Sequence, residues 1–91
     1  MQEKILLVED NQINQELVLD FLENTPCQVI LAHDGHAAVE CFYKQRFDVV
    51  LMDCHMPSMD GFQATRVFRE LEKNFSWRRT PIIAVTAHAL K

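Results

Sequence analysis

A chain of 91 residues forms one domain at most, and its apolar fraction of 48% is enough for a modest core. The formal net charge of −4 argues against nucleic acid as the partner of this segment, because phosphate binding needs clustered Lys and Arg. No apolar run exceeds four residues and no secretory leader precedes the first run, so we expect a cytoplasmic chain without a membrane span.

Short apolar runs rich in branched residues recur along the chain. They predict four strands, at Lys4–Val8, 27–32, 48–52 and 81–85. Runs of this kind are apolar on both faces, which is typical of buried parallel strands.

In the segments between these runs, apolar residues recur at the spacing of a helix. The positions are Ile13, Leu17, Val18, Phe21 and Leu22, which form one broad apolar face; then Ala38, Val39 and Phe42; then Ala64, Val67, Phe68 and Leu71. Asn11 is suited to cap the first helix, and a fourth helix would only begin within 87–91. The alternation predicts an α/β fold, with a parallel sheet, right-handed crossovers and helices on both faces.

Acidic residues stand at the ends of two predicted strands. Glu9 and Asp10 close the first strand, and Asp53 closes the third. In open α/β sheets ligands bind outside the carboxyl ends of the strands, so neighbouring strands would bring three carboxylates into one crevice. A hard cation such as Mg²⁺ relieves their repulsion. Asp10 could instead be a helix cap, but Asp53 caps no obvious helix, and together the three favour a cation site.

The loop after Asp53 contains Pro57 and an Asp60-Gly61 turn, and it can aim a backbone carbonyl at a cation beside Asp53. The lone His55 in this loop is interpreted as a solvent-facing side chain. The fourth strand leads into Thr86-Ala87, where a hydroxyl could bond a phosphoryl oxygen and a small neighbour leaves room for it.

The sequence feature most like a basic patch is the pair Arg78-Arg79, which follows Trp77. A solvated turn is the favoured interpretation of this pair.

Residues 5–11, 50–61 and 83–87, with Gly35 opening the second helix, closely resemble the receiver domain of response regulators and hybrid histidine kinases. Asn11 and Asn14 after the acidic pair, and residues 86–90, look most like receivers fused to hybrid kinases or working in phosphorelays. The resemblance covers the whole chain, so residues 1–91 are expected to be a receiver domain that is incomplete at its C-terminus.

The resemblance implies a flavodoxin-like, doubly wound parallel sheet of order 2-1-3-4, with the fifth strand and fifth helix absent from this chain. Strand four would then be an apolar edge that favours self-association. The resemblance also implies that a receiver lysine, carried by the fifth strand, has no counterpart in this chain, because Lys91 lies too close to Thr86. Phosphorylation and switching are expected to be weakened accordingly.

The resemblance also implies a role for each site residue. Asp53 would accept a phosphoryl group from a histidine kinase or a His-containing phosphotransfer protein. Asp10, Asp53 and the backbone carbonyl of His55 would bind Mg²⁺ or Mn²⁺ directly, and Glu9 would act on the metal mostly through water. These implied roles describe a self-catalysed phosphoacceptor rather than a turnover enzyme.

The remaining implied roles concern the conformational switch and the lifetime of the phosphorylated state. Thr86, with Ala87, would bind the phosphoryl group and act as the switch, and His55 and His88 would tune dephosphorylation. In a membrane-bound hybrid kinase the segment would be a cytoplasmic part.

Two other functions stay open. A non-switching receiver could act as an interaction module through its open edge. An aspartyl-nucleophile phosphohydrolase ranks last, because it would need an acid where this chain has His55.

Overall fold

The computed structural model describes residues 3–53 and 61–85. Its elements in chain order are β1 (Lys4–Val8), α1 (Gln12–Leu22), β2 (Gln28–Ala32), α2 (Gly35–Lys44), β3 (Val49–Asp53), α3 (Gly61–Asn74) and β4 (Ile82–Val85). The predicted alternation of strands and helices is confirmed. The strand limits differ by one residue, so that Asp53 belongs to β3 and Asp48 precedes it.

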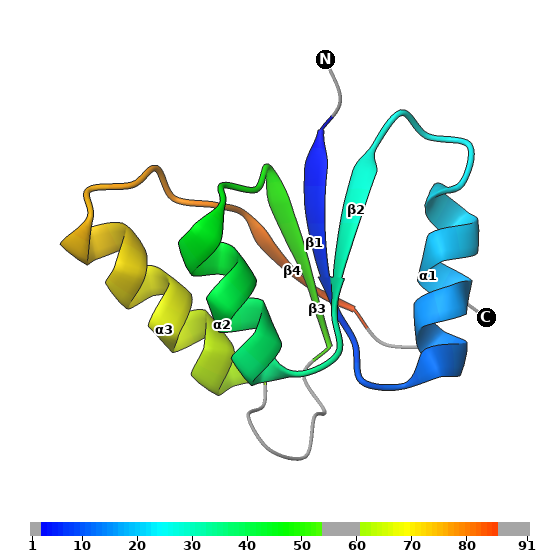
Figure 1. Cartoon of the computed structure of the whole chain (residues 1–91), viewed down its shortest axis with the longest axis horizontal. Coiled ribbons are helices and arrows are strands. Elements are labelled where there is room, and N and C mark those ends of the chain that lie inside the picture. Colours follow the sequence, from blue (N-terminus) through cyan, green and yellow to red (C-terminus); the bar gives the residue numbers. More distant parts are fainter. Residues whose placement is uncertain (1–2, 54–60, 86–91) are drawn as a thin grey trace.

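The described strands form one parallel sheet of order β2-β1-β3-β4, which confirms the predicted flavodoxin-like order. Val8 is level with both Ala32 and Met52, and Asp53 is level with Val85. Figure 1 shows α1 on one face of this sheet and α2 with α3 on the other. The sheet is therefore doubly wound, and the carboxyl ends of β1 and β3 lie side by side.

The main core lies between the sheet and the α2–α3 layer. Leu6, Val8, Val50 and Met52 are almost fully buried there, among ten buried residues of one cluster. Phe42 from α2 and Phe68 from α3 stack with ring centroids 4.2 Å apart. This packing fixes the two helices against the central strands and gives the carboxyl edge a rigid base.

The opposite face of the sheet is only partly covered by α1. Only Val18 of α1 is fully buried, while Ile13 and Phe21 are each 70% exposed. In β4, Ile83 is 52% exposed, so this strand is not buried on both faces. A helix is about 10 Å wide, and four strands spaced about 4.8 Å apart form a wider surface than one helix covers. Within the described residues, the predicted apolar face of α1 is thus only partly used.

Side-chain caps set the starts of α1 and α2. Asn11 Oδ1 accepts a hydrogen bond from Asn14 N at 3.1 Å, which confirms the predicted cap. Asp34 Oδ1 does the same for Ala37 N at 2.7 Å. Each cap satisfies a backbone donor that the first helical turn leaves without an intrahelical partner.

A buried ion pair joins α3 to the segment before β4. Glu72 is 6% exposed, and its Oε1 lies 2.8 Å from Arg69 Nη1. Glu72 Oε2 accepts from Thr80 N at 2.7 Å, and Arg69 Nη1 donates to Thr80 O at 2.9 Å. The pair therefore satisfies both backbone groups of Thr80 and fixes the entry into β4.

No helix within residues 3–53 and 61–85 has both the length and the apolar character needed to cross a membrane.

Candidate functional site

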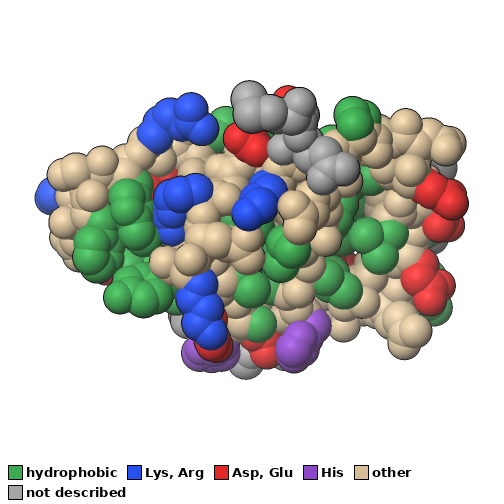
Figure 2. Space-filling model, turned by 45° about the horizontal axis from the view of Figure 1, so that its top comes forward, with side chains coloured by type: hydrophobic (Ala, Val, Ile, Leu, Met, Phe, Trp, Pro, Cys, Tyr) green, Lys and Arg blue, Asp and Glu red, His purple; other side chains and the backbone are tan. Residues whose placement is uncertain are grey.

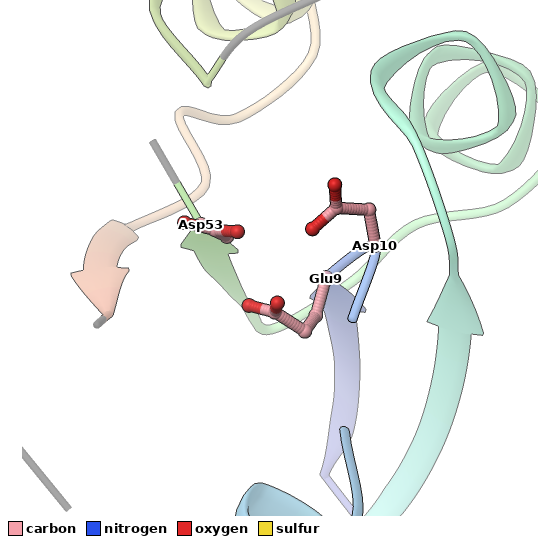
Figure 3. Close-up of side chains that lie close together, drawn as sticks. All are labelled: Glu9, Asp10 and Asp53. Carbon is pink, nitrogen blue, oxygen red and sulfur yellow. The ribbon is translucent and has the colours of Figure 1, made fainter. Parts of the chain in front are cut away.

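The acidic residues meet at the carboxyl edge of the sheet. Because Val8 pairs with Met52, Glu9 and Asp53 lie level on neighbouring strands. Figure 3 shows the carboxylates of Glu9, Asp10 and Asp53 around one shared space, the first two from the end of β1 and the third from the end of β3. One carboxylate oxygen from each lies within 4.8 Å of the other two. The structure thus brings together the three carboxylates that the sequence singled out.

Hydrogen bonds from the start of α1 hold Glu9 in place. Its Oε1 accepts from Asn11 N and from Asn14 Nδ2, each at 3.2 Å. Gln15 Nε2 donates to the backbone oxygen of Glu9 at 2.7 Å. These hydrogen bonds fix the Glu9 carboxylate beside the shared space, where it also interacts with Asp53.

The electrostatics of the cluster favour binding of a positive charge. Glu9 and Asp53 are only 5% and 8% exposed. Burial raises the pKa of Glu9 above its ordinary value of 4.5, hydrogen bonds from Asn14 and Asn11 lower it in part, and the Asp53 carboxylate raises it further. A carboxylate whose charged form is disfavoured by burial and a like charge is stabilised by a nearby cation.

The donor set fits a hard divalent cation. Mg²⁺ takes six oxygen ligands at about 2.1 Å, so adjacent ligand oxygens lie roughly 3 Å apart and opposite ones about 4.2 Å. The separations of up to 4.8 Å in the cluster are slightly wider than this. Small movements of the side chains, or a water between one carboxylate and the ion, would complete such a shell. Asp10 is exposed, which leaves an open side for water and for a phosphoryl oxygen.

Four other predicted site residues lie outside the described residues. They are His55, Thr86, Ala87 and His88, and their predicted roles remain predictions. The described part of β4 ends at Val85, which pairs with Asp53. Thr86 is the next residue in the sequence.

Sequence reasoning missed two residues that shape the site. Asn14 and Gln15 were not assigned contacts with Glu9, although both donate hydrogen bonds to it. The available signal was their spacing, since residues three and four positions after a cap face back toward it in a helix. Side-chain amides at those positions, beside a buried acid, are candidates for holding that acid.

Comparison with known proteins agrees with the fold. Residues 5–91 match the model of the family described as "Response regulator receiver domain", and the chain belongs to that family. The chain is 44% identical over 95 residues to hybrid signal transduction histidine kinase B of Dictyostelium discoideum. That match covers 96% of this chain and 5% of the kinase. The chain therefore corresponds to a small part of that relative's length.

Two solved structures extend the comparison. The receiver domain of sensor histidine kinase PA1611 from Pseudomonas aeruginosa, with a magnesium ion coordinated in its active-site cleft, is 45% identical. It aligns with a TM-score of 0.84 over 100% of this chain and 72% of its own. The receiver domain of Ssk1 from Saccharomyces cerevisiae, solved with the histidine phosphotransfer protein Ypd1, is 28% identical. Its TM-score is 0.79, over 91% of this chain and 61% of that one.

Proposed function

We propose that this chain is a phosphoacceptor domain that takes a phosphoryl group onto Asp53 in a Mg²⁺-dependent reaction. The observation that carries the proposal is the cluster of Glu9, Asp10 and Asp53, whose oxygens lie within 4.8 Å at the carboxyl edge of the sheet. The magnesium ion in the cleft of the PA1611 receiver supports the choice of metal. Mn²⁺, which also prefers oxygen ligands, is expected to substitute.

The chain's own residues supply the nucleophile and its position. A carboxylate oxygen of Asp53 attacks the phosphorus of a phosphohistidine donor, the P–N bond breaks, and the imidazole leaves with the electron pair. The product is an acyl phosphate on Asp53. Asn11 and Asn14 hold the Glu9 carboxylate beside Asp53, and Asp10 remains open to solvent. Mg²⁺, when bound, would offset the negative charges of the carboxylates and of the phosphoryl oxygens.

Several finer assignments belong to this proposal. The phosphoryl donor is a histidine kinase or a His-containing phosphotransfer protein, a choice supported by the solved complex of Ypd1 with the Ssk1 receiver. Thr86, with Ala87, is assigned to phosphoryl binding and switching, His55 to a metal-directed carbonyl, and His55 and His88 to tuning. These assignments rest on their places in the sequence beside Asp53 and Val85. A cytoplasmic location is also proposed, because the chain belongs to the receiver family and its relatives include hybrid histidine kinases.

The test is phosphorylation by a small phosphodonor. The chain is incubated with acetyl phosphate and Mg²⁺, and intact mass spectrometry should show the addition of one phosphoryl group. Hydroxylamine should remove that group, because it cleaves acyl phosphates. Chelation of Mg²⁺ and the substitution Asp53→Asn should each abolish the adduct. Asp20→Asn, which changes an exposed aspartate on α1, is the matched control and should retain it.

An equal adduct on Asp53→Asn would overturn the assignment of the phosphoacceptor. No adduct on the wild type, together with a mass in solution that grows with concentration, would instead favour an interaction module that associates through β4. The self-association predicted from that edge stays a prediction until such a measurement.

A further inference from the structure

The edge of the sheet at which the strands begin, here called the amino edge, carries a row of contacting aromatic rings that lies apart from the acidic site. Tyr43 meets Phe75 edge to face at 5.9 Å, and Phe75 stacks on Trp77 at 4.9 Å. Tyr43 and Phe75 are 56% and 50% exposed. Large aromatic side chains that stay half exposed beside one another are typical of contact surfaces rather than of core packing.

Arg46, which follows the end of α2 by two residues, stacks on one of these rings. The Arg46 guanidinium lies 3.2 Å from the centroid of the Trp77 ring, and it also donates a hydrogen bond to Phe42 O. Partial burial lowers the pKa of Arg46, yet a guanidinium stays charged at physiological pH. Because the cation is already stacked and hydrogen-bonded, little side-chain entropy remains to be lost when a ligand pairs with it.

The turn after α3 carries a second arginine, Arg78, which lines the same hollow as Arg46. Trp77 N donates to Glu72 O at 2.8 Å, and Ser76 adopts a left-handed conformation with φ of 56°. This closure folds Trp77 back onto Phe42 and leaves Arg78 exposed. A hollow of ≈ 420 Å³ lies at this point, lined by Arg46, Phe47, Ser76, Trp77, Arg78 and Thr80. We call Tyr43, Arg46, Phe75, Trp77 and Arg78 the aromatic–arginine surface.

Charge is distributed unevenly about this surface. Residues 40–46 and 69–80 contain six Lys and Arg against three Asp and Glu, a net +3, whereas the rest of the chain carries −7. Two of those three acids are already paired, Glu40 with Lys44 and Glu72 with Arg69. Figure 2 brings the amino edge forward and shows hydrophobic side chains gathered at the left end with Lys and Arg beside them. The two segments that carry the exposed aromatic rings therefore have a net positive charge in a chain that is negative as a whole.

We propose that the aromatic–arginine surface docks an acidic segment of a partner protein that also carries an apolar side chain. A carboxylate of that segment fits the hollow between Arg46 and Arg78, where two guanidinium groups can donate to it. An apolar side chain of the segment covers Tyr43 and Phe75, whose rings are rigid and half exposed. Aromatic residues and arginine are the residue types enriched at the energetic centres of protein interfaces.

Two other occupants fit the surface less well. The phosphates of a nucleic acid extend beyond this surface, where the net charge of −7 on the rest of the chain repels them. A short acidic segment contacts the positively charged segments alone. A second copy could offer α1, which is acidic and exposes Ile13 and Phe21. That contact would join unlike surfaces, so it would build a ring or an open filament and not a two-fold dimer. It would also bring together two chains of net charge −4.

The test uses Trp77, the only tryptophan of the chain, as its own reporter. A short synthetic peptide of Glu, Asp and Leu with one Phe is titrated into the whole 91-residue chain, and Trp77 emission is followed. We expect saturable binding that weakens as salt is added. Arg78→Glu should raise the dissociation constant about tenfold. Arg66→Glu, an equal change of charge at an exposed site on α3, should raise it less than about twofold.

Tyr43→Ser tests the apolar half of the surface without a change of charge, and should weaken binding about fivefold. Circular dichroism of each variant checks that the fold is intact. Equal effects of Arg78→Glu and Arg66→Glu would overturn the proposal, as would equal binding of a peptide with Lys in place of its acids. Tighter, Arg78-dependent binding of a single-stranded RNA, or a Trp77 signal that depends on protein concentration alone, would also overturn it in favour of the other occupants.

Discussion

Glu9 makes favourable hydrogen bonds, but its surroundings disfavour the negatively charged form of its carboxylate. Asn11 N and Asn14 Nδ2 both donate to its Oε1, which fixes the side chain at the start of α1. Burial and the Asp53 carboxylate raise its pKa in spite of these bonds. Sites built to bind a cation commonly carry such a local destabilisation of the ligand-free protein. At the proposed cation site, the stability of the metal-free protein and the affinity for metal are therefore opposed at this residue.

Replacing Glu9 with Gln should raise the melting temperature of the metal-free protein at neutral pH. The Gln oxygen can accept the same two hydrogen bonds, while the like-charge contact with Asp53 is removed, an effect of order 1 kcal/mol. For a domain of this size, that corresponds to roughly 4–8 °C. Calorimetry in a chelating buffer measures the change, with Glu70→Gln on the exposed side of α3 as the control.

The effect of Glu9→Gln should depend on pH in a defined direction. The folded pKa of Glu9 lies above its ordinary value of 4.5, so the folded state holds this proton more tightly than the unfolded state. The stabilisation that comes from this tighter proton binding is present in full below the pKa that Glu9 has in the unfolded chain. It is lost as the pH rises through the pKa that Glu9 has in the folded protein. The stability gap between variant and wild type should therefore be small in acid and widen toward neutral pH. A gap that is constant over this range would contradict a raised pKa at Glu9.

At the scale of elements, the buried ion pair of α3 was not predictable from the apolar pattern. The sequence pattern identified the core positions Ala64 and Phe68, and both are fully buried. It did not identify Glu72, which is 6% exposed and bonds Thr80. An acid at the end of an amphipathic face is normally solvated, and only the return of the chain before β4 supplies its partners. Tertiary context of this kind is absent from local periodicity.

Removing the Glu72 carboxylate should destabilise the joint between α3 and β4. Glu72→Ala leaves Thr80 N without its acceptor and Arg69 without its ion partner, at a cost of about 2–3 kcal/mol. Glu72→Gln keeps one acceptor and should cost about 1 kcal/mol. Chemical denaturation measures both, and Glu70→Ala, at an exposed position, should change stability by less than about 0.5 kcal/mol.

The pH dependence of Glu72 has the opposite sign to that of Glu9. Burial raises the pKa of Glu72, but hydrogen bonds from Arg69 and Thr80 and the Arg69 charge outweigh it and hold the pKa below 4.5. The stabilisation is thus present above the unfolded pKa and is lost as pH falls through the folded pKa. The gap between wild type and Glu72→Gln should close in acid. Persistence of the full gap at low pH would show that packing, not charge, dominates at this position.

At the scale of the whole molecule, the sequence predicted the fold class well but not how far each apolar side chain of α1 is buried. Alternating patterns predicted strands and helices, and the resemblance to receivers predicted the strand order that brings Glu9 beside Asp53. Periodicity also predicted a broad apolar face on α1, and Ile13 and Phe21 of that face are each 70% exposed. An apolar stripe shows that a helix has a face for burial, but it does not show which segment covers that face. The contacts of Arg46 with Trp77 were missed for the same reason, since they join α2's end to a distant turn.

Mg²⁺ should stabilise the whole domain through the acidic cluster. A ligand that binds only the folded state at a hundred times its dissociation constant adds about 2.7 kcal/mol. For a domain of this size the melting temperature should rise by roughly 10–20 °C. Calorimetry with and without Mg²⁺ measures the shift, which Asp53→Asn should reduce and Asp20→Asn should leave unchanged. Equal shifts in the two variants would place the bound ion elsewhere.

The parallel sheet sets the acidic cluster at one edge and the aromatic–arginine surface at the other. Because every described strand runs the same way, the carboxyl ends of β1 and β3 lie opposite the turns that carry Arg46 and Trp77. A protein docked at the amino edge would therefore leave Asp53 accessible. If that protein also carried a phosphodonor on a flexible segment, docking would raise the donor's effective concentration at Asp53, and a weak docking contact would then be enough to set which donor is used.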